Sequence, residues 1–270
     1  MKFKLGTASY AYLWKTTIED AIEEIARHGF HYLELMTTAP HLSPATGPWE
    51  RKLIRRLLDS HGIQLLSVNP TFLDTNLISL NEDFRRLSIS NIKKNIQLTS
   101  DLGGSIVVLI PGRRQGLIPA PYNISLEVAK ESITECLEEA ARCNMIIGLE
   151  NAPSCFIETG EQVAQLVREI NHSNLKIVFD VANAFMVEPV VEGLTKVKDH
   201  LALVHLSDTT RDKWGHLPVG VGSVDFYEVS QFLQQISYQG VSILEITAAR
   251  DLEEGLIRSI DSLEKMNWSR

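Results

Sequence analysis

The feature that most constrains the fold is a regular alternation of strand-like and helix-like segments along almost the whole chain. Strand-like runs occur eight times, at residues 2–10, 31–36, 63–70, 105–112, 145–151, 175–180, 201–208 and 241–247. Each is followed by a segment with helical spacing of apolar residues, at 18–29, 49–62, 82–102, 124–143, 159–170, 188–199, 225–236 and 252–266. Near-continuous apolar strands that alternate with helices indicate a parallel sheet covered by helices.

Eight such units fit the closure of a (β/α)8 TIM barrel, and 270 residues suit that α/β fold as one domain over residues 1–270. A doubly wound open sheet is the structural alternative. That fold normally has a glycine-rich turn after its first strand, whereas this chain has GTASYAYLW there. No linker rich in proline, glycine or serine divides the sequence, so a single barrel is the prediction.

Charge and composition argue against two classes of partner. A net charge of −8 and a pI of about 5.5 give no overall basic surface for nucleic acid or a membrane. No window approaches the ~20 apolar residues of a membrane span, and the N-terminus has no apolar stretch of signal-peptide length. The three cysteines, Cys136, Cys143 and Cys155, lack the spacing of a metal finger and suit a reducing compartment. We therefore expect a cytoplasmic protein.

Polar side chains follow the apolar part of four successive strands in the second half of the chain. Glu150 belongs to the fifth strand, Asp180 to the sixth, His205 to the seventh and Glu245 to the eighth. The carboxyl ends of barrel strands open onto one face, so these side chains should meet there. Three crowded carboxylates repel one another unless a cation lies among them, and this ligand set suits Mn²⁺, Mg²⁺, Co²⁺ or, less typically, Zn²⁺. The pattern predicts a site for one divalent metal ion.

With these four residues the chain resembles the xylose isomerase-like TIM barrels. The resemblance extends from KLGTASYAY through GFHYLELM to ILEIT and includes RDKWGHLPVGVGSVDF at 211–226. That superfamily includes sugar and sugar-phosphate isomerases and epimerases, inosose and dehydroshikimate dehydratases, and abasic-site nucleases of the endonuclease IV type. The resemblance implies that one divalent ion, with Mn²⁺ as the first expectation, is bound by Glu150, Asp180, His205 and Glu245.

The resemblance also implies substrate contacts in the loops after strands six and seven. Arg211 lies six residues after His205, where ketose epimerases of the family have a substrate-binding arginine, and His216 matches a histidine just before the glycine turn. Relatives commonly have a histidine three residues after Asp180, whereas this chain has Asn183. An amide can still hydrogen-bond a substrate but is a poor metal ligand, so Asn183 argues against a multi-metal nuclease.

Other residues near strand ends are weaker candidates for substrate contact. Arg113 and Arg114 follow strand four, where a cationic loop could receive a carboxylate or a phosphate, although exposed loop arginines are equally common. The remaining candidates are polar or aromatic residues at or after the first three strands: Trp14, Glu34, His41 and Asn69.

These residues together predict a divalent-metal-dependent isomerase or epimerase that acts on a sugar, sugar phosphate or related polyol. The metal would polarise the substrate carbonyl and stabilise the enediolate that forms when an adjacent carbon loses its proton. The resemblance gives Glu150 and Glu245 the roles of acid and base. A dehydratase of the inosose or dehydroshikimate type is the main alternative, because it begins with the same proton abstraction. An abasic-site nuclease and a non-catalytic metal- or sugar-binding barrel are further alternatives, and the relatives allow a homo-oligomer.

Overall fold

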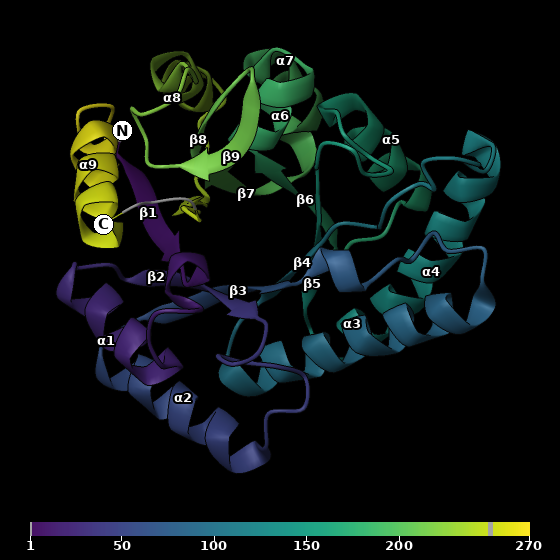
Figure 1. The fold of residues 1–270 in the computed structure, drawn as a ribbon, viewed down its shortest axis with the longest axis horizontal. Coiled ribbons are helices and arrows are strands. Elements are labelled where there is room, and N and C mark those ends of the chain that lie inside the picture. Colours follow the sequence, from purple (N-terminus) through teal and green to yellow (C-terminus); the bar gives the residue numbers. More distant parts are fainter. Residues whose placement is uncertain (1, 248–250) are drawn as a thin grey trace.

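Parallel strands close into a ring in the computed structural model, which describes residues 2–247 and 251–270 (Figure 1). Each strand pairs with the next along the chain, and β1 completes the ring by pairing with β10. A short ninth strand, β11 (Trp268–Ser269), pairs with β1. This closure excludes the open doubly wound sheet and confirms the predicted (β/α)8 barrel. The ring strands are β1 (Phe3–Ala8), β2 (Tyr32–Thr37), β3 (Gln64–Pro70), β4 (Ile106–Leu109), β5 (Ile146–Glu150), β6 (Leu175–Asp180), β7 (Leu201–Leu206) and β10 (Val241–Leu244).

Helices lie outside the ring and cover the strands (Figure 1). Local sequence signals set several of their ends: Asn81 caps α3, and Thr159 forms a capping box with Gln162 at the start of α5. Gly103 ends α3 in the left-handed conformation that favours glycine. The helices are α1 (Ile18–Arg27), α2 (Pro48–Ser60), α3 (Glu82–Leu102), α4 (Tyr122–Arg142), α5 (Gly160–Ile170), α6 (Val181–Val187), α7 (Val190–Val197), α8 (Phe226–Gln235) and α9 (Leu252–Glu264).

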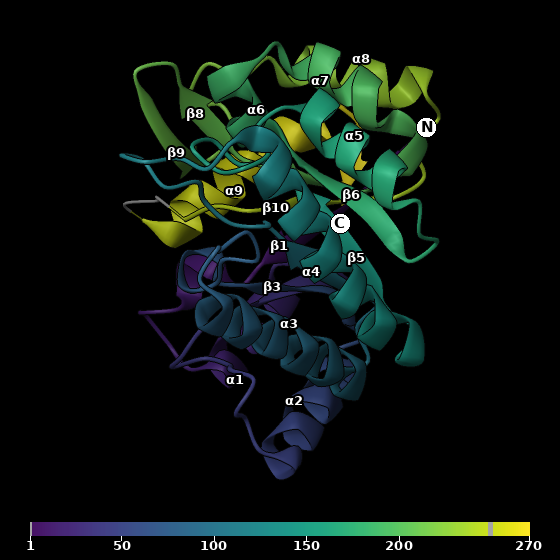
Figure 2. The same ribbon diagram turned by 90° about the vertical axis from the view of Figure 1, so that its right-hand side faces the viewer.

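Two segments after β6 and β7 differ from the sequence prediction. The range predicted as one helix, 188–199, contains α7 and the start of a 3-10 turn at Lys198–His200, and an additional helix that was not predicted, α6, precedes it. Pro189 lies between α6 and α7, where its missing N–H and its effect on the preceding residue separate the two helices. The strand predicted at 201–208 stops at Leu206, and β8 (Asp208–Thr210) then forms an antiparallel hairpin with β9 (Lys213–Leu217). Figure 2 shows this hairpin projecting at one end of the barrel.

Separate apolar clusters lie on the outer and inner faces of the barrel strands. The larger one lies between the strands and the surrounding helices, and a smaller one includes Leu66, Ile106, Val178 and Ile243, whose alternation with the outward residues places them inside the ring. The inner packing is tight at Gly148, where an added Cβ would lie 2.5 Å from the Cγ2 atom of Val178. The interior is therefore filled with side chains, as in other barrels of this size, and polar chemistry is confined to its end.

The longest helices, α3 and α4, carry charged residues such as Lys94 and Glu138 on their exposed faces. Within the described residues, no helix combines the length and the apolar character that crossing a membrane requires. The three cysteine thiols are unpaired, with those of Cys136 and Cys155 buried.

Candidate metal and substrate site

Four strand ends direct three carboxylates and one imidazole into the mouth of the barrel. Each of these residues lies two positions after a residue of the barrel interior, as Asp180 follows Val178, so the alternation of side chains along a strand turns them inward. The strand register places Asp180 beside His205, and the backbone N–H of Glu245 donates to the carbonyl of Leu206. All four predicted ligands are buried, and their ligand atoms lie within 4.8 Å of one another: Glu150, Asp180, His205 and Glu245.

One carboxylate oxygen in this cluster has no hydrogen-bond donor. Asp180 is fully buried, and its Oδ1 accepts from the backbone N–H of Asn183 at 2.6 Å, which caps α6. Its Oδ2 has no hydrogen-bond partner and faces Nδ1 of His216 at 3.8 Å. A buried carboxylate oxygen that accepts no hydrogen bond is costly, and a divalent cation would satisfy it. The three carboxylates and the imidazole therefore fit a divalent ion of the kind predicted from the sequence.

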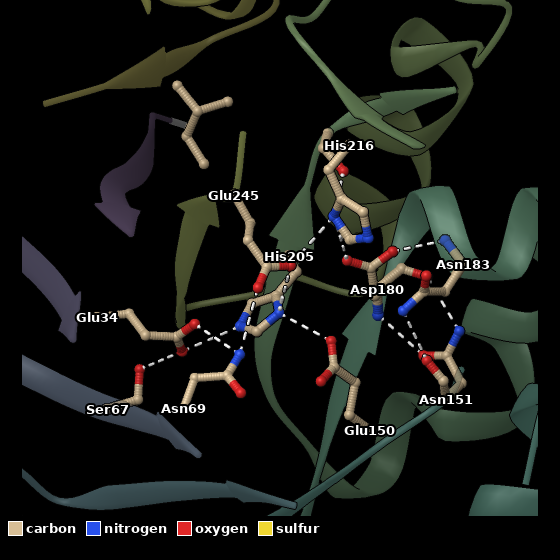
Figure 3. A network of polar contacts seen from close by, with 12 residues as sticks. Glu34, Ser67, Asn69, Glu150, Asn151, Asp180, Asn183, His205, His216 and Glu245 are labelled. Atoms are coloured by element: carbon tan, nitrogen blue, oxygen red, sulfur yellow. Dashed lines mark hydrogen bonds and ion pairs between the residues drawn. The ribbon is translucent and has the colours of Figure 1, made fainter. Parts of the chain in front are cut away.

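Glu34 lies behind His205 rather than in the cavity. The Nδ1 atom of His205 lies 3.0 Å from Glu150 Oε1 and 3.5 Å from Glu245 Oε2, whereas its Nε2 lies 3.1 Å from Glu34 Oε2 (Figure 3). Glu34 is completely buried and also accepts from Ser67 Oγ at 2.6 Å. A proton on Nε2 that bonds Glu34 leaves the lone pair of Nδ1 directed at the cluster, the usual arrangement of a metal-binding histidine. The candidate role of Glu34 as a substrate contact is therefore replaced by a role in orienting His205.

The two carboxylates with predicted catalytic roles have opposite tendencies to hold a proton. Burial raises the pKa of Glu150 to about 8, although the charge of His205 opposes this effect. Burial also acts to raise the pKa of Glu245, but His205 and His216 outweigh it and hold that pKa well below its usual range. Burial raises the pKa of Asp180 to about 6. A cation at this position would have to compete with protons held on the cluster.

His216 joins the cluster from strand β9. Its Nδ1 lies 3.0 Å from Ser207 Oγ and 3.3 Å from Glu245 Oε2. Burial alone would lower the pKa of this imidazole, but the charges of Asp180 and Glu245 raise it to about 9. His216 therefore presents a positive charge to the carboxylates from the outer side of the site.

A cavity of about 510 Å³ opens above these groups and is lined by Glu150 and Glu245. We call it the site cavity. Its size suits a small organic ligand. The structure brings four of the residues predicted for substrate contact to its wall, namely Asn69, Arg113, Asn183 and His216. Asn69 also donates through Nδ2 to Glu34 Oε1 at 3.1 Å and to Glu245 Oε1 at 3.3 Å, so it links the carboxylate behind the site to one in the cavity.

Three other residues predicted for substrate contact do not line the site cavity. The guanidinium of Arg211 lies 4.1 Å above the ring of Phe185, where a cation–π contact holds the tip of the β8–β9 hairpin against α6. His41 is buried, with its Nε2 2.7 Å from the carbonyl oxygen of Thr16, so it joins two loops. Trp14 is 79% exposed. The sequence placed these residues in the correct loops, but the paths of those loops direct them elsewhere.

The side chain of Asn183 is already engaged within the protein. Its Nδ2 donates to the carbonyl of Asn151 at 3.0 Å, and its Oδ1 accepts from Nε1 of Trp214 at 2.9 Å. Trp214 belongs to β9 and lines the site cavity, with its ring at an angle to that of His216. The asparagine that stands where relatives commonly have a histidine therefore fixes an aromatic wall of the cavity.

Sequence reasoning missed several residues that build this end of the barrel. Tyr10 follows β1 directly and lines the site cavity, and burial, followed by the charges of Glu245 and Glu150, raises the pKa of its hydroxyl well above the usual value. Asp208 accepts backbone N–H bonds from Gly220 and Gly222, each at 2.9 Å, and thereby shapes the glycine turn. The available signal was position, because Tyr10 is the last residue of the strand predicted at 2–10 and Asp208 is the last residue of the strand predicted at 201–208.

Comparisons with known proteins agree with this geometry. The sequence profile of the family described as "Xylose isomerase-like TIM barrel" matches residues 22–266. The uncharacterized protein MJ1311 of Methanocaldococcus jannaschii is 28% identical over 257 residues, which cover 93% of this chain and 86% of that protein. A D-psicose 3-epimerase of Ruminiclostridium cellulolyticum is 23% identical over 91% of this chain and 83% of its own length. The crystal structure of a D-tagatose 3-epimerase-like protein superposes with a TM-score of 0.86 at 27% identity and covers 99% of this chain and 98% of that one.

Proposed function

The chain belongs to the xylose isomerase-like TIM barrel family, and from this premise we propose that it is a divalent-metal-dependent isomerase or epimerase of a sugar, sugar phosphate or related polyol. The observation that carries the proposal is the placement of Glu150 and Glu245. Both carboxylates line the same cavity, and both lie within 3.5 Å of Nδ1 of His205. The relative that is a D-psicose 3-epimerase supports a ketose as the type of substrate.

The chemistry requires a group that removes a proton from the carbon next to a carbonyl and a group that returns one. Glu150 ends β5 and Glu245 follows β10, so the two carboxylates enter the site cavity from different strands. One accepts the proton, and for epimerisation the other donates a proton to the opposite face of the same carbon. Asn69 orients Glu245 through its hydrogen bond at 3.3 Å, and Asn69, Arg113, Asn183 and His216 are the proposed contacts to substrate.

One divalent ion completes the proposed site, with Mn²⁺ as the first choice and Mg²⁺, Co²⁺ or Zn²⁺ as alternatives. Glu150, Asp180, His205 and Glu245 would hold it, and the unpaired Oδ2 of Asp180 supports this assignment. When bound, the ion supplies Lewis-acid polarisation of the substrate carbonyl and stabilises developing negative charge on oxygen. Among the described residues that line the site cavity, His216 is the single histidine, which favours a one-metal enzyme over a multi-metal nuclease.

The direct test is exchange of substrate protons with solvent. The protein is incubated in D₂O with Mn²⁺ and a panel of ketopentoses, ketohexoses, their phosphate esters and inososes, and deuterium incorporation next to the carbonyl is followed by NMR. Glu150→Gln and Glu245→Gln should each slow exchange by about 10²-fold or more, since each removes a proton-transfer group. Glu161→Gln on the exposed face of α5 is the matched control and should have no effect.

The metal content of each variant is measured in parallel, so that loss of the ion is distinguished from loss of proton transfer. Full exchange activity in both Glu150→Gln and Glu245→Gln would refute the mechanism. Exchange accompanied by the absorbance of a conjugated enone would assign the protein to the dehydratases instead. Metal binding without exchange on any member of the panel would favour a non-catalytic binding protein, and cleavage of abasic-site DNA would favour a nuclease.

The composition supports a proposal for the type of substrate and for the cellular location. The net charge of −8 supports a small-molecule substrate rather than nucleic acid or a membrane surface. The unpaired cysteines support a cytoplasmic location, with residues 1–270 acting as one domain.

A further inference from the structure

A second cavity, of about 520 Å³, adjoins the site cavity, because Arg113 lines both. Its wall comes from the segments that follow β3 and β4 and includes Arg113, Arg114 and Gln115. We call it the arginine cavity. Among the described residues that line it, none is an aspartate or a glutamate. The arginine cavity therefore concentrates positive charge on a chain whose net charge is −8.

Neither arginine is neutralised by a carboxylate of the described residues. No such group lies within ion-pair distance of Arg113 or Arg114, whereas Arg86, for example, is paired with Glu135. Among the described residues, the carbonyl of Ala120 is the one acceptor of the Arg114 guanidinium, at 3.1 Å. Arginines that keep free donors at the wall of a cavity are suited to bind an anion, because the planar guanidinium matches the oxygens of phosphate and carboxylate groups.

The backbone that carries these arginines is held in place. The N–H of Phe156 donates to the carbonyl of Gly112 at 2.9 Å, and Nδ2 of Asn76 donates to the carbonyl of Arg113 at 3.1 Å. Gly112 has a φ of +132°, and a Cβ at this position would lie 2.1 Å from Oδ1 of Asn76, so glycine is required for the close approach. The loop is thus anchored where the two cavities meet, which fixes the backbone positions from which the side chains of Arg113 and Arg114 extend.

The remaining polar groups of the arginine cavity also favour an anion. Oε1 of Gln115 accepts from the backbone N–H groups of Leu117 and Ile118, at 2.5 Å and 2.9 Å, so its amide nitrogen is left to donate. The site cavity has a different lining, since it includes the carboxyl groups of Glu150 and Glu245, and Arg113 is the one lysine or arginine among its described lining residues. A ligand with a neutral polyhydroxy part and a negatively charged part would match this pair of cavities.

We propose that the arginine cavity binds a negatively charged substituent of the substrate, a phosphate ester or a carboxylate, while the polyhydroxy ketone part lies against Glu150 and Glu245. This proposal rests on the proposed function and narrows its substrate class to anionic ketoses. Arg113 contacts the substituent at the border of the two cavities, and Arg114 and Gln115 contact it further out.

The test is direct binding, measured by isothermal titration calorimetry on the full chain with Mn²⁺. The probes are inorganic phosphate, a panel of ketopentoses and ketohexoses, their terminal phosphate esters, and the corresponding keto sugar acids. At least one ester or acid should bind tenfold or more tightly than its uncharged parent, which is the gain expected from charge-assisted bonds to arginine. Arg113→Ala should abolish this preference, and Arg56→Ala on α2 is the matched control that should keep it.

The remaining outcomes separate this proposal from the proposed function. Glu150→Gln should keep the preference for the charged probe, so a protein without turnover would still report on the arginine cavity. Preference for the phosphate esters or for the sugar acids would identify which anion is used. Equal binding of charged and uncharged probes, an unchanged preference in Arg113→Ala, or inorganic phosphate binding as tightly as every ester would overturn the proposal. Absence of binding by every charged probe in the millimolar range would overturn it as well.

Discussion

Replacing Glu34 by glutamine tests whether this buried carboxylate orients the imidazole of His205, a proposed metal ligand. Glu34 Oε2 accepts from Ser67 Oγ at 2.6 Å and faces Nε2 of His205 at 3.1 Å, while Oε1 accepts from Nδ2 of Asn69 at 3.1 Å. Glutamine has nearly the same shape but only one acceptor oxygen, so it cannot satisfy all three partners. We expect Glu34→Gln to fold and to bind metal more weakly.

The size of the effect follows from the two orientations that glutamine can take. If its NH₂ group lies toward His205, the imidazole must move its proton to Nδ1, the nitrogen that faces the other ligands. If the NH₂ group lies toward Asn69, that amide must rotate and turn its oxygen toward Glu245, with which it now shares a hydrogen bond of 3.3 Å. Either change disturbs a ligand, and loss of such a supporting partner typically costs ~10–100-fold in metal affinity, or about 1.4–2.8 kcal/mol.

The assay is calorimetric titration of Mn²⁺ into the wild-type protein, Glu34→Gln and the control Glu23→Gln, which alters an exposed carboxylate on α1. Circular dichroism and thermal unfolding of each protein establish that the barrel is intact. An affinity of Glu34→Gln within twofold of the wild-type value would refute the assignment of Glu34 as the group that fixes His205.

Three further predictions concern protonation, the aromatic wall and the barrel interior. Burial raises the pKa of Glu150 to about 8 and that of Asp180 to about 6, so Mn²⁺ must displace protons from these carboxyl groups when it binds. The affinity for Mn²⁺, measured by calorimetry, should therefore fall as the pH is lowered from 8 to 6. The expected decrease is up to about tenfold per pH unit for each proton displaced. Asn183→Ala should lower the free energy of unfolding in urea by about 1–3 kcal/mol, because it removes the bond from Trp214 and leaves a buried carbonyl unpaired, and an unchanged value would contradict this role. Gly148→Ala should lower the same free energy by about 1–3 kcal/mol, because the new methyl group would lie 2.5 Å from a side chain inside the barrel, and a stability equal to the wild type would show that the interior can relax.

The positions of the metal-ligand candidates could be predicted because they depend on local periodicity. A residue two positions after an interior residue of a strand faces the interior again. The side chain of Asp180 therefore points into the barrel, as that of Val178 does, and this direction does not depend on the conformation of the loops. The order of parallel strands then brings neighbouring strand ends together, and Asp180 lies beside His205. Neither step requires knowledge of contacts between distant segments.

The positions of loop residues were harder to predict, because they depend on contacts between segments that are distant in the sequence. Arg211 was expected at the substrate because ketose epimerases of the family have a substrate-binding arginine at this position, but the hairpin formed by β8 and β9 places it against the ring of Phe185. The same hairpin brings Trp214 to the cavity wall, a residue that no spacing rule singled out. A change of one or two residues in the length of a turn would alter which hairpin residues line the cavity, so local sequence patterns do not determine these positions.

The sequence by itself determined that the chain forms an eight-unit barrel and that Glu150, Asp180, His205 and Glu245 meet at one end of it. Both results follow from the repeat of strands and helices and from the fixed geometry of parallel strands. Only the tertiary structure decided that Glu34 contacts His205 and that Arg113 lines two adjoining cavities. Glu34 and His205 are 171 positions apart, and a contact over that distance depends on the packing of the whole barrel, which no local pattern of residues encodes.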